Sequence, residues 1–163
     1  MKTNASGPNR LSRTAAKDVP HRSDERFFAA KADVKKLCED LLHDLRHSPM
    51  HAPMVADLET AVKRIQQQLK DITPDEPKAS TQVRDMSKEV QHLQVAETWV
   101  SATERVLTRL GSDAPHDMRD ELLEAQDTVM WHVRAQNWNG ELTAATTNLQ
   151  KLVQSAEAEA ARH

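Results

Sequence analysis

Tyrosine is absent from this 163-residue chain, and aromatic residues of all kinds make up only 3% of it. A core with so few rings must consist mainly of aliphatic side chains packed between secondary-structure elements. Glycine occurs 3 times and proline 7 times, whereas the residues that lose least entropy in a helix (Ala, Leu, Glu, Gln, Lys and Arg) are plentiful. This composition argues against an extended sheet and predicts an all-α fold.

Cysteine is also scarce, because Cys38 is the single one in the chain and has no partner for an intramolecular disulfide. It falls on the apolar face of a predicted helix beside Leu37 and Leu41, so we interpret it as a small core residue and not as a nucleophile. Apolar runs of about eighteen residues are missing, as is the apolar segment of a secretory signal. We therefore expect no membrane insertion and an intracellular, cytoplasmic location.

Charge is distributed unevenly along the chain. Residues 1–22 hold five basic residues and one acidic residue, a net charge of +4, whereas the remainder holds 17 basic and 24 acidic residues, a net charge of −7. Such an arm either is a solvated tail or contacts something anionic, such as nucleic acid or an acidic protein surface. The candidate partner-binding residues in it are Arg10, Arg13, Lys17 and Arg22.

Apolar residues recur at steps of three and four positions, which is the spacing of one face of a helix. In the second predicted helix this stripe forms a coiled-coil-like seam, which consists of Val55, Leu58, Val62, Ile65 and Leu69. The seam could pack against another helix of the same chain or against a second copy of the chain. Ser23 is suited to cap the first helix, and Gly111 to end the third in a left-handed conformation. The five predicted helices cover about residues 23–47, 53–72, 80–110, 115–136 and 141–160.

The predicted helices group into parts along the chain. A basic polar N-terminal arm, residues 1–22, precedes a helical hairpin, residues 23–72, and a three-helix segment, residues 78–163, packs with the hairpin as one helical domain. The long third helix has a second apolar strip, so it should contact neighbours on two sides; this strip consists of Val95, Trp99 and Val106. The overall prediction is a bundle of about five amphipathic helices with coiled-coil-like seams and a polar N-terminal arm.

Three histidines near the end of the first predicted helix are spaced so that a metal site could be considered: His43, His47 and His51. The residues between the first two lack the glutamate base of the zinc-protease pattern and include Arg46, whose charge would disfavour a cation. Histidines at a helix end, where the helix dipole tolerates cations, explain the same pattern. We predict no metal and no cofactor.

The tryptophans are the other residues of interest, because tryptophan is enriched at binding hot spots and also plugs cores. Trp138 falls in the turn Asn137–Gly140 and is predicted to seal the end of the hairpin formed by the fourth and fifth helices. Trp131 lies off the main apolar stripe of the fourth helix. It is therefore the best candidate for an exposed anchor that binds a partner.

Residues 80–158 resemble a spectrin-type three-helix repeat, with Trp99 in the first helix, Leu122 and Leu123 in the second and an aliphatic stripe in the third. Any three-helix bundle with a tryptophan shares these features. The resemblance therefore names no family for the chain. It implies only a structural role.

The sequence contains no glycine-rich phosphate loop, no nucleophile elbow and no cysteine pair, and its paired acids fall on polar helix faces. We therefore predict a non-enzymatic interaction or scaffold subunit of a larger assembly, such as a cytoskeletal or coat complex, whose partners are other proteins. Self-association is left open. The alternative is a ribonucleoprotein component that contacts nucleic acid through the basic arm, against which stand the acidic remainder of the chain and its pI of about 6.2.

Overall fold

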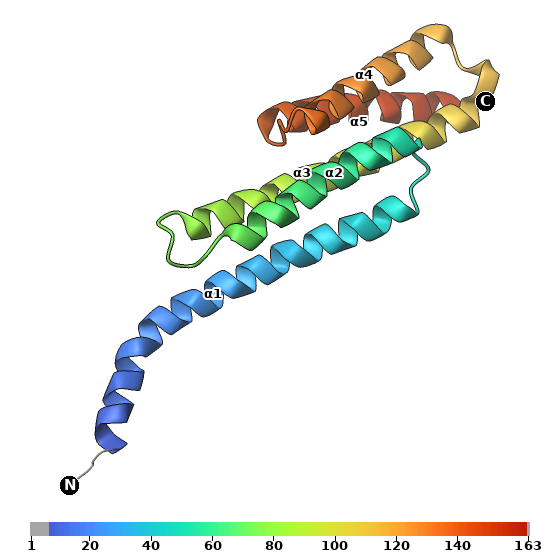
Figure 1. Ribbon diagram of the computed structural model, residues 1–163. Coiled ribbons are helices and arrows are strands. Elements are labelled where there is room, and N and C mark those ends of the chain that lie inside the picture. The colour runs from blue at the N-terminus through green and yellow to red at the C-terminus, as the bar shows by residue number, and fades with distance from the viewer. Residues whose placement is uncertain (1–6, 163) are drawn as a thin grey trace.

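A computed structural model describes the backbone of residues 7–162 and the side chains of residues 24–162. Within these limits the chain forms five α-helices and one short 3₁₀ helix, with no strand (Figure 1). The predicted fold class, an all-α bundle of five packed helices, is confirmed. The elements are α1 (Gly7–Arg46), α2 (Ala52–Asp71), α3 (Ala79–Leu110), η1 (Gly111–Asp113), α4 (His116–Arg134) and α5 (Gly140–Arg162).

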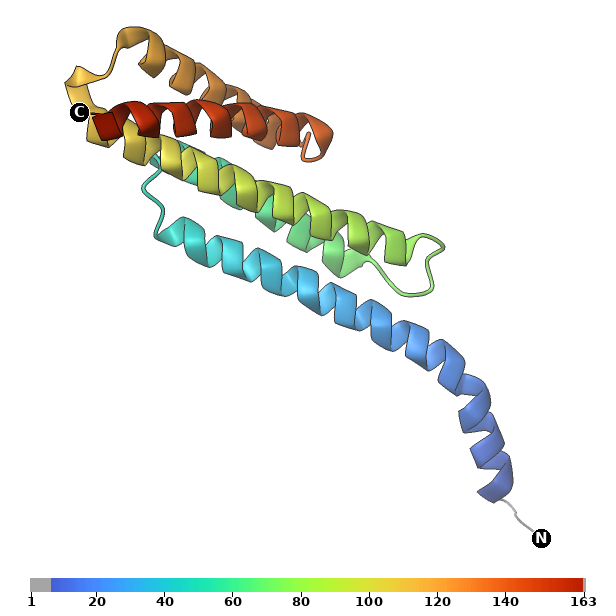
Figure 2. The same cartoon turned by 180° about the vertical axis from the view of Figure 1, so that it is seen from behind.

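The first helix is longer than the sequence pattern indicated. α1 begins at Gly7, so the predicted start at Ser23 is wrong. Ser23 can cap a helix, but no glycine or proline directly precedes it to break the backbone, and a helix is able to continue through it. Pro20 removes one backbone hydrogen bond inside α1. Figures 1 and 2 show that α1 bends in its blue N-terminal part, as expected of a helix with an internal proline.

The hairpin of α1 and α2 is held together by the apolar stripes that the spacing predicted. The stripe of α1 is buried at three- and four-residue steps, at Phe27, Val34, Cys38, Leu41 and Leu45. Pro49 in the link disfavours continuation of α1, and Pro53 lies in the first turn of α2, where its missing N–H costs no helical hydrogen bond. The buried positions of α2 are Leu58, Ala61, Val62, Ile65 and Leu69.

The third helix occupies the middle of the bundle and contacts all four other α-helices (Figures 1 and 2). This position explains why it needs apolar residues on more than one side. Of the second strip predicted on α3, Val106 is buried and Trp99 is half-buried, but Val95 is exposed. The expectation of neighbours on two sides is therefore confirmed, although Val95 lies outside the contact.

The connections into and out of α4 are tight. α3 ends at Leu110, and the 3₁₀ helix η1 begins at Gly111. Gly111 has the predicted positive φ, 57°, but its ψ of −141° lies outside the left-handed helical region. Between α4 and α5, Trp138 is buried and donates its indole N–H to the carbonyl oxygen of Val133 at 2.9 Å. The Nδ1 atom of His92 on α3 lies 2.7 Å from the carbonyl oxygen of Trp138. The turn is thus tied to both α4 and α3, and the predicted seal at the end of this hairpin is confirmed.

Candidate protein-interaction surfaces

Trp131 lies near the C-terminal end of α4 with 55% of its surface exposed. Its predicted exposure is confirmed, while its role in binding stays a prediction. The opposite side of α4 is anchored in the core by Leu122, Val129 and Val133, which are all buried. Packing on this side therefore holds the backbone of α4 in place, and the exposed indole of Trp131 is attached to a rigid helix.

Acidic residues accompany Trp131 on the exposed side of α4. Asp120, Glu124, Asp127 and Trp131 follow one another at steps of three and four positions, so they lie on one helix face. We call these four residues the acidic–tryptophan strip. Its three carboxylates are exposed and form no ion pair with any residue that the structure describes. The strip therefore presents three unneutralised negative charges beside one large aromatic ring.

The arginine that follows Trp131 on α4 is already engaged. Arg134 lies three residues after Trp131, and its Nη1 atom lies 3.1 Å from a carboxylate oxygen of Asp57 on α2. This ion pair crosses between the two helices at a half-exposed position, where such pairs contribute only modestly to stability. It nevertheless directs the guanidinium of Arg134 toward Asp57, and Arg134 forms no ion pair with a carboxylate of the acidic–tryptophan strip.

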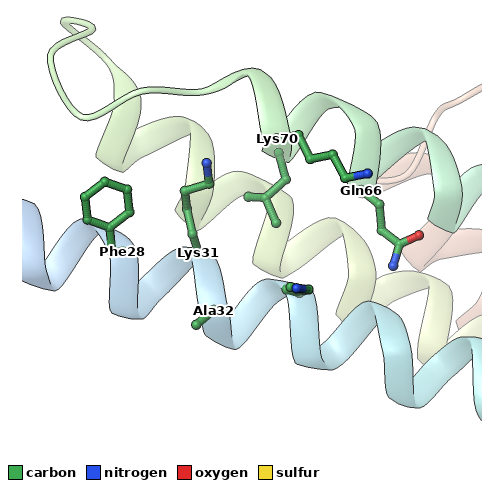
Figure 3. A pocket seen from close by; sticks show the side chains of 7 residues that line it. Phe28, Lys31, Ala32, Gln66 and Lys70 are labelled. Atoms are coloured by element: carbon green, nitrogen blue, oxygen red, sulfur yellow. The ribbon is translucent and has the colours of Figure 1, made fainter.

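A second surface lies between α1 and α2, where the hairpin opens into a groove of about 550 Å³ (Figure 3). Figure 3 shows Phe28 and Lys31 rising from α1 and Lys70 and Gln66 from α2, on the two sides of this hollow. None of the acidic side chains that the structure describes lines it. We call it the lysine groove; its lining residues are Phe28, Lys31, Ala32, Lys35, Gln66, Leu69 and Lys70.

The lysines of this groove differ in their surroundings. Lys31 donates a hydrogen bond from Nζ to the carbonyl oxygen of Ile72 at 2.9 Å and lies 5.6 Å from the centre of the Phe27 ring. Lys35 and Lys70 form no hydrogen bond or ion pair with any described residue. Lys31 is thus held in place by the fold, whereas the other two ammonium groups keep all their hydrogen-bonding capacity for a ligand.

Phe28 supplies the apolar wall of the lysine groove, with 53% of its surface exposed. Its ring meets that of the buried Phe27 edge to face, with 5.4 Å between the ring centres. Sequence reasoning missed this surface. The pattern that could have found it is the adjacent pair Phe27 and Phe28, because neighbouring residues in a helix point about 100° apart and only one of them can face the core.

A polar junction joins the α1–α2 link to α3. The Ser101 hydroxyl on α3 donates to Glu97 at 2.6 Å, and the Ser48 and Ser101 hydroxyl oxygens lie 3.2 Å apart. The Nε2 atom of His51 lies 3.2 Å from a carboxylate oxygen of Glu104, which follows Glu97 on α3 by about two helical turns. The Ser48–Ser101 contact and the His51–Glu104 contact thus both join the link to α3, whereas the Ser101–Glu97 hydrogen bond lies within α3.

The histidines considered as metal ligands separate in the structure. The rings of His43 and His47 contact each other with 5.0 Å between their centres, whereas His51 turns to Glu104. In the part of the chain with described side chains, no group of three or more His, Cys, Asp or Glu residues is placed to hold a metal ion. The geometry therefore does not bring these three residues together.

Cys38 lies fully buried in the hairpin core, as predicted. Burial among apolar neighbours, with a smaller contribution from the negative charge of Glu39, raises the pKa of its thiol to about 11. The thiolate is the reactive form of cysteine, so this environment suppresses nucleophilic chemistry at neutral pH. Cys38 is therefore a buried core residue that packs between apolar side chains.

The remaining candidate residues are those of the basic arm. Arg10, Arg13, Lys17 and Arg22 lie outside the residues whose side chains the structure describes. Their proposed contact with an anionic partner stays a prediction, as does the division of the chain at residue 22.

A comparison of the chain with known protein families, with curated proteins and with solved structures finds no match. Among the described residues, no helix is both long enough and apolar enough to cross a membrane. The acidic–tryptophan strip and the lysine groove are the features of the described residues that bear on function.

Proposed function

We propose that this chain is a non-enzymatic subunit of a larger protein assembly, in which the helical bundle is a spacer that presents binding surfaces to other proteins. The observation that carries the proposal is Trp131, an exposed tryptophan on a helix whose opposite face is fully packed. Tryptophan is among the residues most enriched at binding hot spots. A large ring exposed on a fixed helix loses little conformational freedom when a partner covers it.

The shape of the bundle supports the same proposal. α3 spans 32 residues and contacts every other α-helix, so it ties both hairpins into a single elongated body (Figure 1). Exposed apolar side chains occur on separate parts of this body, at Phe28 on α1, Val95 on α3 and Leu123 and Trp131 on α4. An elongated body with separated apolar sites suits a component that holds several partners at fixed spacing.

The proposal is tested by placing a photoreactive phenylalanine analogue at position 131 of the full chain in cells that express it. We expect covalent adducts with other polypeptides after illumination. The matched control carries the same analogue at Gln154, which is exposed on α5 and lies in neither named surface. Adducts confined to position 131 would support the proposal, whereas equal or absent adducts at both positions would contradict it.

A further inference from the structure

We propose that the acidic–tryptophan strip of one copy of this chain docks into the lysine groove of a second copy, so that copies associate head to tail. The inference rests on the proposed function and specifies one partner for it. It is drawn from two surfaces of the same chain that match in charge and in chemistry, although they lie on different helices.

The charges of the two surfaces are equal in number and opposite in sign. The strip presents Asp120, Glu124 and Asp127, and the groove presents three lysines at positions 31, 35 and 70. Apart from the bond of Lys31 to Ile72, these six side chains have no polar partner among the described residues. Contact between the surfaces would therefore neutralise charges that the isolated chain leaves to solvent, and opposite potentials favour such an encounter.

The groove also suits the ring that the strip would insert. Its volume of about 550 Å³ lies in the range of clefts that bind small-molecule ligands, roughly 300–1,000 Å³. Its floor includes the buried Leu69, and its wall is the exposed Phe28 ring. Trp131 would therefore meet an aromatic and aliphatic surface, with Lys35 and Lys70 near enough to approach the indole face as cations.

The arrangement of the helices decides how such copies would assemble. α1 and α4 make no contact in the described part of the chain, and Figures 1 and 2 place them on opposite sides of the bundle. A chain therefore cannot fill its own groove with its own strip. Each copy offers one groove and one strip to different neighbours, a heterologous contact that produces open chains of copies unless the rotation closes a ring.

The test measures the apparent mass of the full-length protein by analytical ultracentrifugation over a range of concentrations and at two salt concentrations. Lys35→Glu with Lys70→Glu disables the groove, and Glu124→Lys with Asp127→Lys disables the strip; all four positions are exposed, so the fold should tolerate these changes. A combined variant with all four changes restores opposite charges in reversed order. The matched control, Lys88→Glu with Lys151→Glu, makes the same change of charge at exposed positions outside both surfaces.

We expect the wild-type mass to rise with concentration, and to rise less in about 0.5 M than in about 0.05 M salt because exposed charges are screened. Each two-residue surface variant should weaken association by about tenfold or more, and Trp131→Ala should do the same. The combined variant should associate again, while the control should behave like wild type. Circular dichroism melting curves check that every variant is folded.

A wild-type chain that stays monomeric at all concentrations would overturn the inference, and so would a combined variant that fails to regain association. An equal effect of the control and the groove variant would overturn it too, since net charge alone would then be responsible. These outcomes would not contradict the proposed function. Adducts from position 131 to other polypeptides would still support that function without any association between copies.

Discussion

Trp138 closes the C-terminal end of α4 by donating its indole N–H to the carbonyl of Val133 at 2.9 Å. The carbonyls of a last helical turn lack partners within the helix, and a side-chain donor satisfies one of them here. The same tryptophan is almost completely buried. It therefore combines apolar packing with a directed hydrogen bond at the turn that leads into α5.

Replacing Trp138 should separate these two contributions. Trp138→Phe keeps most of the apolar surface but removes the donor, so we expect a loss of about 1 kcal/mol in the free energy of unfolding. Trp138→Ala also leaves a cavity and should lose about 3–5 kcal/mol. Urea unfolding followed by circular dichroism measures both. Trp131→Phe is the control, because this exposed position should change stability by less than about 0.5 kcal/mol; equal losses at positions 131 and 138 would contradict the assignment.

Replacement of glycine by alanine is expected to change the stability of the fold in opposite directions at two positions. Gly111 has a φ of +57°, which side chains rarely adopt, whereas Gly140 begins α5 with an ordinary φ, and a Cβ at either position meets nothing within 4 Å. Gly111→Ala should therefore destabilise through backbone strain alone, by about 1–2 kcal/mol. Gly140→Ala should stabilise by about 0.4–1 kcal/mol, because it restricts the unfolded chain. Thermal melts of the two variants check the sign, and a shift in the same direction for both would refute the argument.

The sequence predicted best those helix ends that a glycine or proline marks. The end of α3 at Gly111 and the start of α2 beside Pro53 follow directly from backbone geometry. The predicted start of α1 was wrong because Ser23 can either cap a helix or lie inside one, and α1 continues through Ser23 to Gly7.

The two candidate surfaces also differ in whether the sequence could predict them. The exposure of Trp131 could be predicted, since it depends only on the position of one residue relative to the apolar stripe of its own helix. The lysine groove could not, because it exists only where the open end of the hairpin brings Lys35 on α1 beside Lys70 on α2. Lateral helix packing of this kind is set by the shapes of many side chains together, which spacing along one helix does not contain.

Glu104 is expected to stabilise the fold because it accepts a hydrogen bond from a buried side chain. Its side chain is 11% exposed and lies 3.2 Å from the largely exposed His51, while the buried Gln126 amide on α4 donates to it at 3.5 Å. Glu104→Ala leaves that amide without its acceptor and should lower the free energy of unfolding by about 1–3 kcal/mol. His51→Ala removes only an exposed pair and should lose less than about 1 kcal/mol. Denaturant titrations of both variants and of the double variant measure the difference, and a larger loss for His51→Ala would contradict it.

Cys38 should make the stability of the fold fall in alkaline solution. Burial raises the pKa of its thiol in the folded chain from the ordinary 9.0 to about 11. The raised folded-state pKa contributes stability that is fully present below pH 9.0 and is lost as the pH rises to about 11, because only the unfolded chain releases the proton in that window.

The absence of tyrosine removes the phenol titrations that would otherwise overlap this range. We therefore expect the free energy of unfolding of wild type to fall more steeply between pH 9 and 11 than that of Cys38→Ala. The measurement is urea unfolding at half-unit pH steps. The variant starts from a lower stability because it removes a buried sulfur atom, so the comparison uses the slope with pH and not the absolute value. Parallel slopes would show that the thiol titrates alike in the folded and unfolded chains, which would contradict the effect expected from its complete burial.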